Sequence, residues 1–172
     1  MNARLLTAAV TMILTSGCAA LTSPYSGQEA RPLKALSADE TRGYLEGRGM
    51  GFAKPAELNG YPGPMHVLEH AGALRLTPAQ EAATAALMAQ HKQEVRELGR
   101  EYIAAEQKLE TLFSSRTASA ESLAEALAAS GKLQTRIRQS HLDTHLKQTA
   151  LLTAEQLLAY SDLRGYHSTR SH

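Results

Sequence analysis

The sequence has few of the residues that build disulfide-linked or aromatic-rich domains. Its 172 residues include one cysteine, no tryptophan and only 5% aromatic residues. A single cysteine excludes an intrachain disulfide and a cysteine-based zinc ribbon. The shortage of aromatic side chains excludes a large aromatic core. The length is that of one domain.

A strong excess of charge of one sign is also absent. Lysine and arginine together number 18, aspartate and glutamate 17, and the formal net charge is +1. This balance excludes a strongly basic nucleic-acid-binding protein, so we expect no nucleic-acid partner.

Proline and glycine are scarce in the second half of the chain. All six prolines lie before residue 79, and only Gly99, Gly131 and Gly165 follow Gly72. The rest of this half is rich in Ala, Leu, Glu and Lys, which favours long helices. No alternating strand pattern is present. We therefore predict an all-α fold.

The first residues have the pattern of an export signal. One positive charge precedes an apolar run over residues 5–14, which is too short for a membrane span of ~20 residues. The only cysteine, Cys18, follows at the expected cleavage point. This resembles a bacterial lipoprotein box, although Thr15 stands where leucine is usual. We expect a periplasmic protein whose only membrane contact is a lipid anchor on Cys18. The alternative is ordinary cleavage just after Cys18.

Helix-start signals divide the rest of the chain. Residues 19–36 are polar and without a period, and Ser37 with Glu40 forms a capping box. Pro64 begins a second short helix that we expect to run to about Arg75. We predict a signal peptide over 1–17, a flexible tether over 18–36, a helical domain over 37–165 and a polar tail over 166–172.

Two long helices follow, and their apolar positions predict a hairpin. Thr77 caps a helix over about 78–115, and a third helix covers about 119–150. Apolar residues recur at spacings of three and four, as in a coiled-coil seam. These positions are Leu87, His91, Val95, Leu98, Tyr102, Ala105, Leu109 and Leu112, then Leu123, Leu127, Ile137, His141 and His145. The short turn between the helices predicts a long antiparallel hairpin, elongated, with short flanking helices. Such a hairpin buries little core, so we expect a homodimer.

Histidines are the candidate metal ligands. His66 and His70 are four residues apart, as are His141 and His145, and such pairs place two imidazoles on one helix face. A hairpin turn near residues 116–117 brings His91 opposite His141 and His145. The five histidines therefore form a candidate site for zinc, nickel, cobalt or copper. Met65 is a candidate soft ligand that we assign instead to the core. A single histidine in a helix seam is otherwise typical of a hydrogen-bonded core residue. No catalytic motif is present, so we expect no enzymatic activity.

The two cap sequences resemble a known family. Residues 76–80 (LTPAQ) and 152–156 (LTAEQ) both read LTxxQ and flank the hairpin. This is similar to the Spy/CpxP-like periplasmic proteins and their heavy-metal-resistance and sensor relatives. The resemblance implies an all-helical, often dimeric fold. It also implies a metal site with an HxxxH before the first LTxxQ and an HxxxM on the last long helix. His66 and His70 match the first pattern, and His141 begins the second, with His145 in place of methionine. Glu94 is a candidate for the carboxylate ligand of that site.

Three functions remain open at this point. The first is a non-enzymatic periplasmic stress or heavy-metal-resistance protein that binds a divalent transition metal through its histidines. The second is an ATP-independent chaperone that holds unfolded clients, or an envelope-stress modulator that contacts a sensor protein. The third is a lipid-tethered helical spacer. The glycine- and proline-rich residues 47–64 are expected to form a fixed irregular segment at the hairpin base.

Overall fold

The computed structural model describes residues 22–166. The predicted signal peptide, the lipidation residue Cys18 and nearly all of the predicted tail lie outside these residues. The chain divides into two compact units, residues 1–30 and 31–172. The described part of the first unit, residues 22–30, consists of turns.

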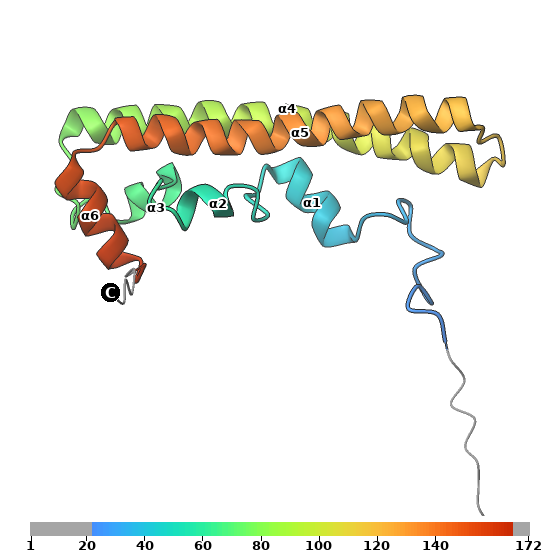
Figure 1. Ribbon diagram of the computed structural model, residues 1–172, viewed down its shortest axis with the longest axis horizontal. Helices are drawn as coiled ribbons and strands as arrows, with labels where there is room; N and C mark the ends of the chain where they lie inside the picture. The colour runs from blue at the N-terminus through green and yellow to red at the C-terminus, as the bar shows by residue number, and fades with distance from the viewer. Residues whose placement is uncertain (1–21, 167–172) are drawn as a thin grey trace, which may run out of the picture. The chain divides into compact units, whose positions relative to one another are not determined.

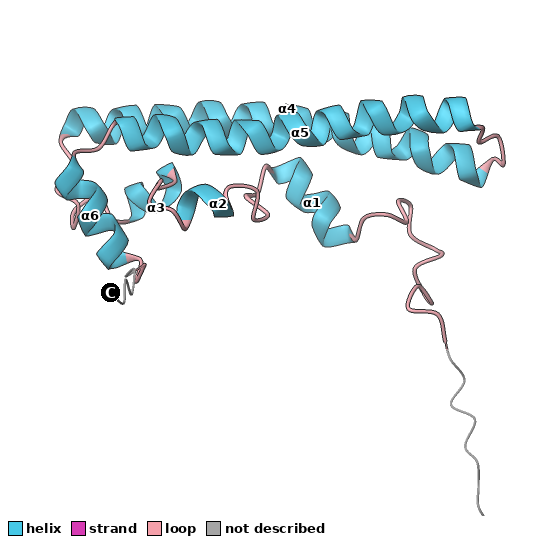
Figure 2. Cartoon of the chain, in the orientation of Figure 1, coloured by secondary structure: helices cyan, strands magenta, loops and turns pink. Residues whose placement is uncertain are grey.

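The second unit is helical. Its helices are α1 (Ala38–Glu46), α2 (Lys54–Glu57), α3 (Pro64–Glu69), α4 (Pro78–Ser114), α5 (Ala120–Ala150) and α6 (Ala154–Leu163). The long helices α4 and α5 lie side by side, while α1, α2 and α3 follow one another along one side of this pair (Figure 1). Helix α6 lies at the end of the hairpin opposite its turn. Residues 22–166 contain no strand (Figure 2). The predicted all-α hairpin with short flanking helices is confirmed.

The central residues of the predicted seam are buried on α4, whereas on α5 the buried residues only partly match the predicted line. Val95, Leu98 and Tyr102 are buried on α4, and Ile137 meets them from α5. Leu127, predicted on the same line as Ile137, is instead 50% exposed. Ten residues separate the two, which turns Leu127 about 80° away from the buried line of the helix. No helix within residues 22–166 is long and apolar enough to cross a membrane.

Helix α1 packs on the hairpin where α4 has a glycine. A Cβ on Gly99 would lie 2.1 Å from the carbonyl oxygen of Tyr44, so only glycine permits this approach. The ring of Tyr44 then packs against Tyr102, with ring centroids 4.5 Å apart. The helix begins with the predicted capping box of Ser37 and Glu40, and Gly47 ends it in the left-handed conformation at φ 66°.

The two LTxxQ sequences bond to each other at the hairpin base. Gln80 and Gln156 each accept from the backbone N–H of their own cap residue, Thr77 at 3.0 Å and Thr153 at 2.9 Å. Their side-chain amides also meet, at nitrogen–oxygen distances of 2.8 and 3.0 Å. Each amide N–H₂ reaches a backbone carbonyl of the other motif's flank, Leu151 or Leu74. The paired motifs therefore fix the starts of α4 and α6 against one another.

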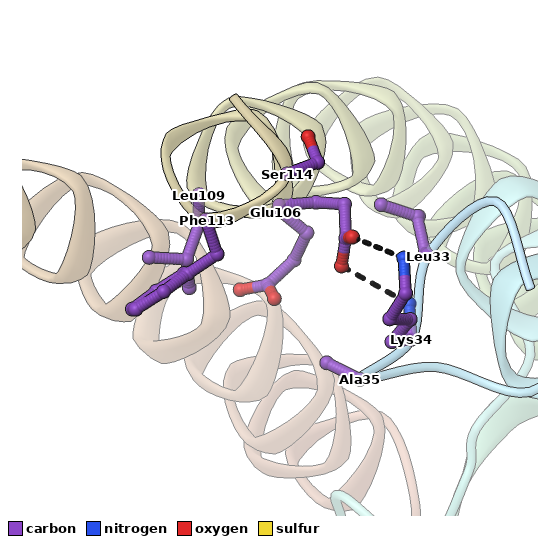
Figure 3. A pocket seen from close by; sticks show the side chains of 8 residues that line it. Leu33, Lys34, Ala35, Glu106, Leu109, Phe113 and Ser114 are labelled. Atoms are coloured by element: carbon purple, nitrogen blue, oxygen red, sulfur yellow. Dashed lines mark hydrogen bonds and ion pairs between the residues drawn. The ribbon is translucent and has the colours of Figure 1, made fainter. Parts of the chain in front are cut away.

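Residues 31–36 pack on α4, although the sequence predicted a tether through residue 36. Leu33 is buried, and Lys34 bonds to the carboxylate of Glu110 through both its backbone N–H and its ammonium group. Figure 3 shows Leu33 and Lys34 facing Glu106, Leu109 and Phe113 across a shallow pocket, with these bonds dashed. The segment that leads into α1 is thus anchored toward the turn of the hairpin.

Candidate functional site

A cavity of about 950 Å³ lies between the hairpin and the segment that runs from α1 to α3. Histidines enter it from both sides: His66 from α3, His91 from α4, and His141 and His145 from α5. Glycines 47, 49, 51 and 63 form much of the outer wall. The predicted irregular segment 47–64 is therefore the wall of this cavity, and it includes the helix α2.

The buried end of the cavity holds a chain of hydrogen bonds across the hairpin. Ser140 donates its hydroxyl proton to Glu94 at 2.8 Å, because a carboxylate only accepts. The same hydroxyl oxygen lies 3.1 Å from Nδ1 of His91, which must then be the donor. Nε2 of His91 consequently accepts from Nδ1 of His141 at 3.1 Å. The chain assigns the Nδ1–H tautomer to both histidines.

His141 is left with an unused lone pair. Its Nε2 is buried and has no hydrogen-bond partner within the described residues. The ring is 5% exposed and stacks on Phe52, with centroids 5.5 Å apart. Burial, followed by repulsion from His91 and His145, lowers the pKa of His141 to about 4. At neutral pH the imidazole is therefore neutral, which is the form that binds a metal ion.

Nε2 of His145 also carries the lone pair, because a different hydrogen bond holds the proton on Nδ1. Its Nδ1 lies 2.7 Å from the carbonyl oxygen of Tyr61, so Nδ1 carries the proton and Nε2 the lone pair. The ring lies directly against Gly63, where a Cβ would come within 2.9 Å of Nε2. Glycine at residue 63 therefore gives the ring the space to lie at the cavity wall.

His66 is the third histidine with this pattern. Its Nδ1 lies 2.7 Å from a carboxylate oxygen of Glu69 on the same helix. This bond lowers the pKa of Glu69, as expected for a carboxylate that accepts from the imidazole. Nε2 of His66 is again the nitrogen that remains for a ligand. A carbonyl or carboxylate on the far nitrogen is the usual second-shell arrangement of metal-binding histidines.

Glu57 is a residue that the sequence analysis missed. Its carboxylate accepts from the hydroxyls of Tyr160 and Tyr166 and lies 3.3 Å from Nε of Arg164. It also accepts the backbone N–H of Gly63 at 3.2 Å and lies 3.8 Å from Nδ1 of His145. Glu57 thus joins the cavity wall to α6. A lone glutamate in a turn-rich segment carries no sequence signal for this role.

The structure brings four of the five predicted histidines to the cavity. His70, the C-cap of α3, is not among the lining residues. His91 lines the cavity, but both of its nitrogens are engaged. Glu94 accepts from Ser140. Met65 was assigned to the core and is instead 48% exposed at the cavity. The helix α3 buries Pro64 and Val67, and Met65 lies about 160° around the helix from Val67.

The donor set suits a transition-metal ion, although it is not assembled in advance. Within residues 22–166 no three His, Cys, Asp or Glu side chains stand close enough to hold one ion. The orphaned Nε2 of His141 is the observation that favours a ligand, because a buried lone pair without a partner is costly. Neutral imidazole nitrogens suit zinc, nickel, cobalt and copper.

Comparisons with known proteins bear on the family. No curated protein and no solved structure gives a significant match to the chain. A family model described as heavy-metal resistance matches residues 44–159, which include the cavity wall, the hairpin and both LTxxQ sequences. This agrees with the resemblance carried by those two sequences. The chain belongs to the heavy-metal resistance family, of the Spy/CpxP-like LTxxQ type.

Proposed function

We propose that this chain is a non-enzymatic, exported heavy-metal-resistance protein that binds a transition-metal ion in the histidine cavity. His141 and His145 are the hairpin ligands, and His66 approaches from α3. His91 is a positioning residue that fixes the tautomer of His141. The observation that carries the proposal is the buried Nε2 of His141, which has no partner within residues 22–166.

Binding would draw the cavity wall toward the hairpin. The ligands are not preassembled, so His66 on α3 must move with respect to His141 and His145 on α5. The lone pairs of several neutral imidazoles would together coordinate the positively charged ion. Because Glu57 joins the same wall to Tyr160 on α6, closure would also reach the end of the hairpin. The ion would stabilise the folded chain, since only the folded form collects these ligands.

Calorimetric titration of the purified protein with Zn²⁺, Ni²⁺, Co²⁺ and Cu²⁺ tests the proposal. We expect one saturable site tighter than about 10 µM for at least one of these ions at pH 7.5. His141→Ala combined with His145→Ala should abolish it, whereas His70→Ala should retain it. Absence of a site in the wild type, or its persistence in the double variant, would contradict the proposal.

Export and anchoring through Cys18 belong to the same proposal, as does a homodimer. The family and the export-like first residues support a periplasmic location. Cys18→Ala should release the protein from the membrane fraction into the periplasmic fraction. If the wild type and the variant are both found in the periplasmic fraction, the lipid anchor is wrong and simple secretion remains.

A client-binding function is the alternative, and exposed apolar side chains near the hairpin turn favour it. Phe113 is 57% and Leu127 50% exposed. A metal-free protein that suppresses aggregation of an unfolded client, and that loses this ability on Phe113→Ser with Leu127→Ser, would support the chaperone. If the variant suppresses aggregation as well as the wild type does, this surface does not bind the client.

A further inference from the structure

Methionines gather at the histidine cavity. The sequence has five methionines, and the three beyond residue 12 are Met50, Met65 and Met88. All three line this cavity, and each comes from a different element: the loop after α1, the helix α3 and the helix α4. Met65 and Met50 are 48% and 39% exposed. Neither side chain is buried in the core, although Sδ of Met50 lies beside Gly43 of α1.

The backbone of Met50 is strained. Its φ is 43°, in the left-handed region that residues other than glycine rarely adopt, and it stands between Gly49 and Gly51. Gly43 provides the space beside it, since a Cβ on Gly43 would lie 2.7 Å from Sδ of Met50. A strained residue at a cavity indicates a functional constraint.

The charges around the cavity favour a singly charged ion over a divalent ion. Its charged lining comprises the cations Arg48, Lys54, Lys92 and Arg96 against the carboxylates Glu46 and Glu57. Arg48 is paired with Asp39 and Glu46, so the positive excess comes from Lys54, Lys92 and Arg96. Glu57 is already bonded to two tyrosine hydroxyls and paired with Arg164. Glu94 accepts from Ser140. The donors that remain are neutral imidazole and thioether. A net positive surrounding repels a doubly charged ion about twice as strongly as a singly charged one.

We propose that the cavity selects a soft, singly charged ion, Cu⁺ or its analogue Ag⁺, through the thioethers of Met50, Met65 and Met88 together with Nε2 of His141 and His145. This rests on the proposed metal-binding function and names the class of ion. Thioether sulfur and imidazole nitrogen together suit Cu⁺, which is a soft ion, better than the borderline ions Zn²⁺, Ni²⁺ and Co²⁺.

Substitution of the methionines by leucine separates this proposal from the proposed function. Leucine keeps the volume and removes the sulfur. The Cu⁺ affinity of the full chain is measured without oxygen, by competition with the chromogenic chelator bicinchoninate. The Zn²⁺ affinity is measured by competition with a zinc-binding dye. Met50→Leu, Met65→Leu and Met88→Leu combined should weaken Cu⁺ binding by about tenfold or more and change Zn²⁺ binding by less than about twofold.

Ag⁺ with methyl-labelled methionine gives a second readout. The ¹³C methyl resonances of the three methionines, assigned from the single leucine variants, should shift together up to one equivalent of Ag⁺. His141→Ala with His145→Ala is the matched control, and it should weaken Cu⁺ and Zn²⁺ alike. If Cu⁺ binds no more weakly to the leucine variant, the soft-ion proposal is overturned while histidine binding of Zn²⁺ stands. If neither ion binds the wild type, both proposals fall.

Discussion

His141 donates its Nδ1–H to Nε2 of His91 across the hairpin, at 3.1 Å. This bond leaves Nε2 of His141 as the one buried ring nitrogen without a partner within the described residues. The direction of the bond is set two steps away, where Ser140 donates to Glu94. A serine that touches no ligand therefore determines which nitrogen of His141 is presented to the cavity.

Removal of that serine hydroxyl should weaken metal binding without unfolding the chain. In Ser140→Ala the tautomer of His91 is no longer fixed, and His141 is free to turn its proton toward the cavity. We expect metal affinity to fall by about tenfold, as for other second-shell changes. Ser130 is the matched control, because it is also buried on α5 but bonds only to its own helix at Leu127. Equal affinities for Ser140→Ala and Ser130→Ala would contradict the tautomer assignment.

Stability should fall in acid because of His141. Its pKa is lowered from 6.5 to about 4 in the folded state, so the unfolded chain binds the extra proton first as pH falls. The stabilisation is complete above about pH 6.5 and is lost between there and about pH 4. Urea unfolding of the metal-free protein at pH 7.5 and pH 5 should differ by about 2 kcal/mol from this group. His141→Gln should reduce the pH dependence by that amount. An unaltered dependence in His141→Gln would contradict the burial of a neutral ring.

Two glycines in the long helices should respond in opposite directions to alanine. Gly99→Ala places a methyl group 2.1 Å from the carbonyl oxygen of Tyr44, so α1 must leave its seat on α4. We expect a loss of about 2–4 kcal/mol in the free energy of unfolding, as for other severe clashes in a packed interface. Gly131 on α5 has no atom within 4 Å of its added Cβ. Gly131→Ala should therefore stabilise the chain by up to about 1 kcal/mol through helix propensity. Thermal unfolding monitored by circular dichroism measures both, and equal effects would contradict the close approach of α1.

The paired glutamines should be coupled energetically. Gln80→Ala and Gln156→Ala each remove the glutamine side of a capping box and leave the other amide short of partners, so each should cost about 1–3 kcal/mol. The double variant should cost less than their sum by about 1 kcal/mol, which a double-mutant cycle in urea measures. Gln93→Ala is the control, since Gln93 is exposed and bonds only to Glu97. Strict additivity of Gln80 and Gln156 would show that the two motifs do not support one another.

Local signals were sufficient to predict the starts of α1, α4 and α6 and the buried seam of α4. The capping boxes of Ser37, Thr77 and Thr153 all form, and the seam from His91 to Ala105 is buried. The turn position also placed His91 opposite His141. These features depend on neighbours in sequence or on a simple register, both of which the sequence contains.

The cavity wall could not be predicted in the same way. Its backbone follows left-handed conformations at Gly47, Met50 and Gly51, and tertiary contacts on α4 and α5 select them. The helix α3 ends at Glu69, well before the predicted end near Arg75, and His70 does not line the cavity although it keeps the helical bond to His66. The exposure of Met65 follows from the face that α3 turns toward the hairpin, where Val67 is buried, and six residues are too few to show that face by their periodicity.

The most direct test of the account is the nitrogen spectrum of the histidine rings. Long-range ¹H–¹⁵N correlation spectra of the metal-free protein at pH 7.5 should show His66, His91, His141 and His145 as Nδ1–H tautomers. On addition of one equivalent of Zn²⁺ or Ag⁺, Nε2 of His141 and His145 should shift, and His66 with them, while His91 keeps its tautomer. An Nε2–H form of His141 before metal, or metal-induced shifts confined to His70 and the histidines of the C-terminal tail, would contradict the account.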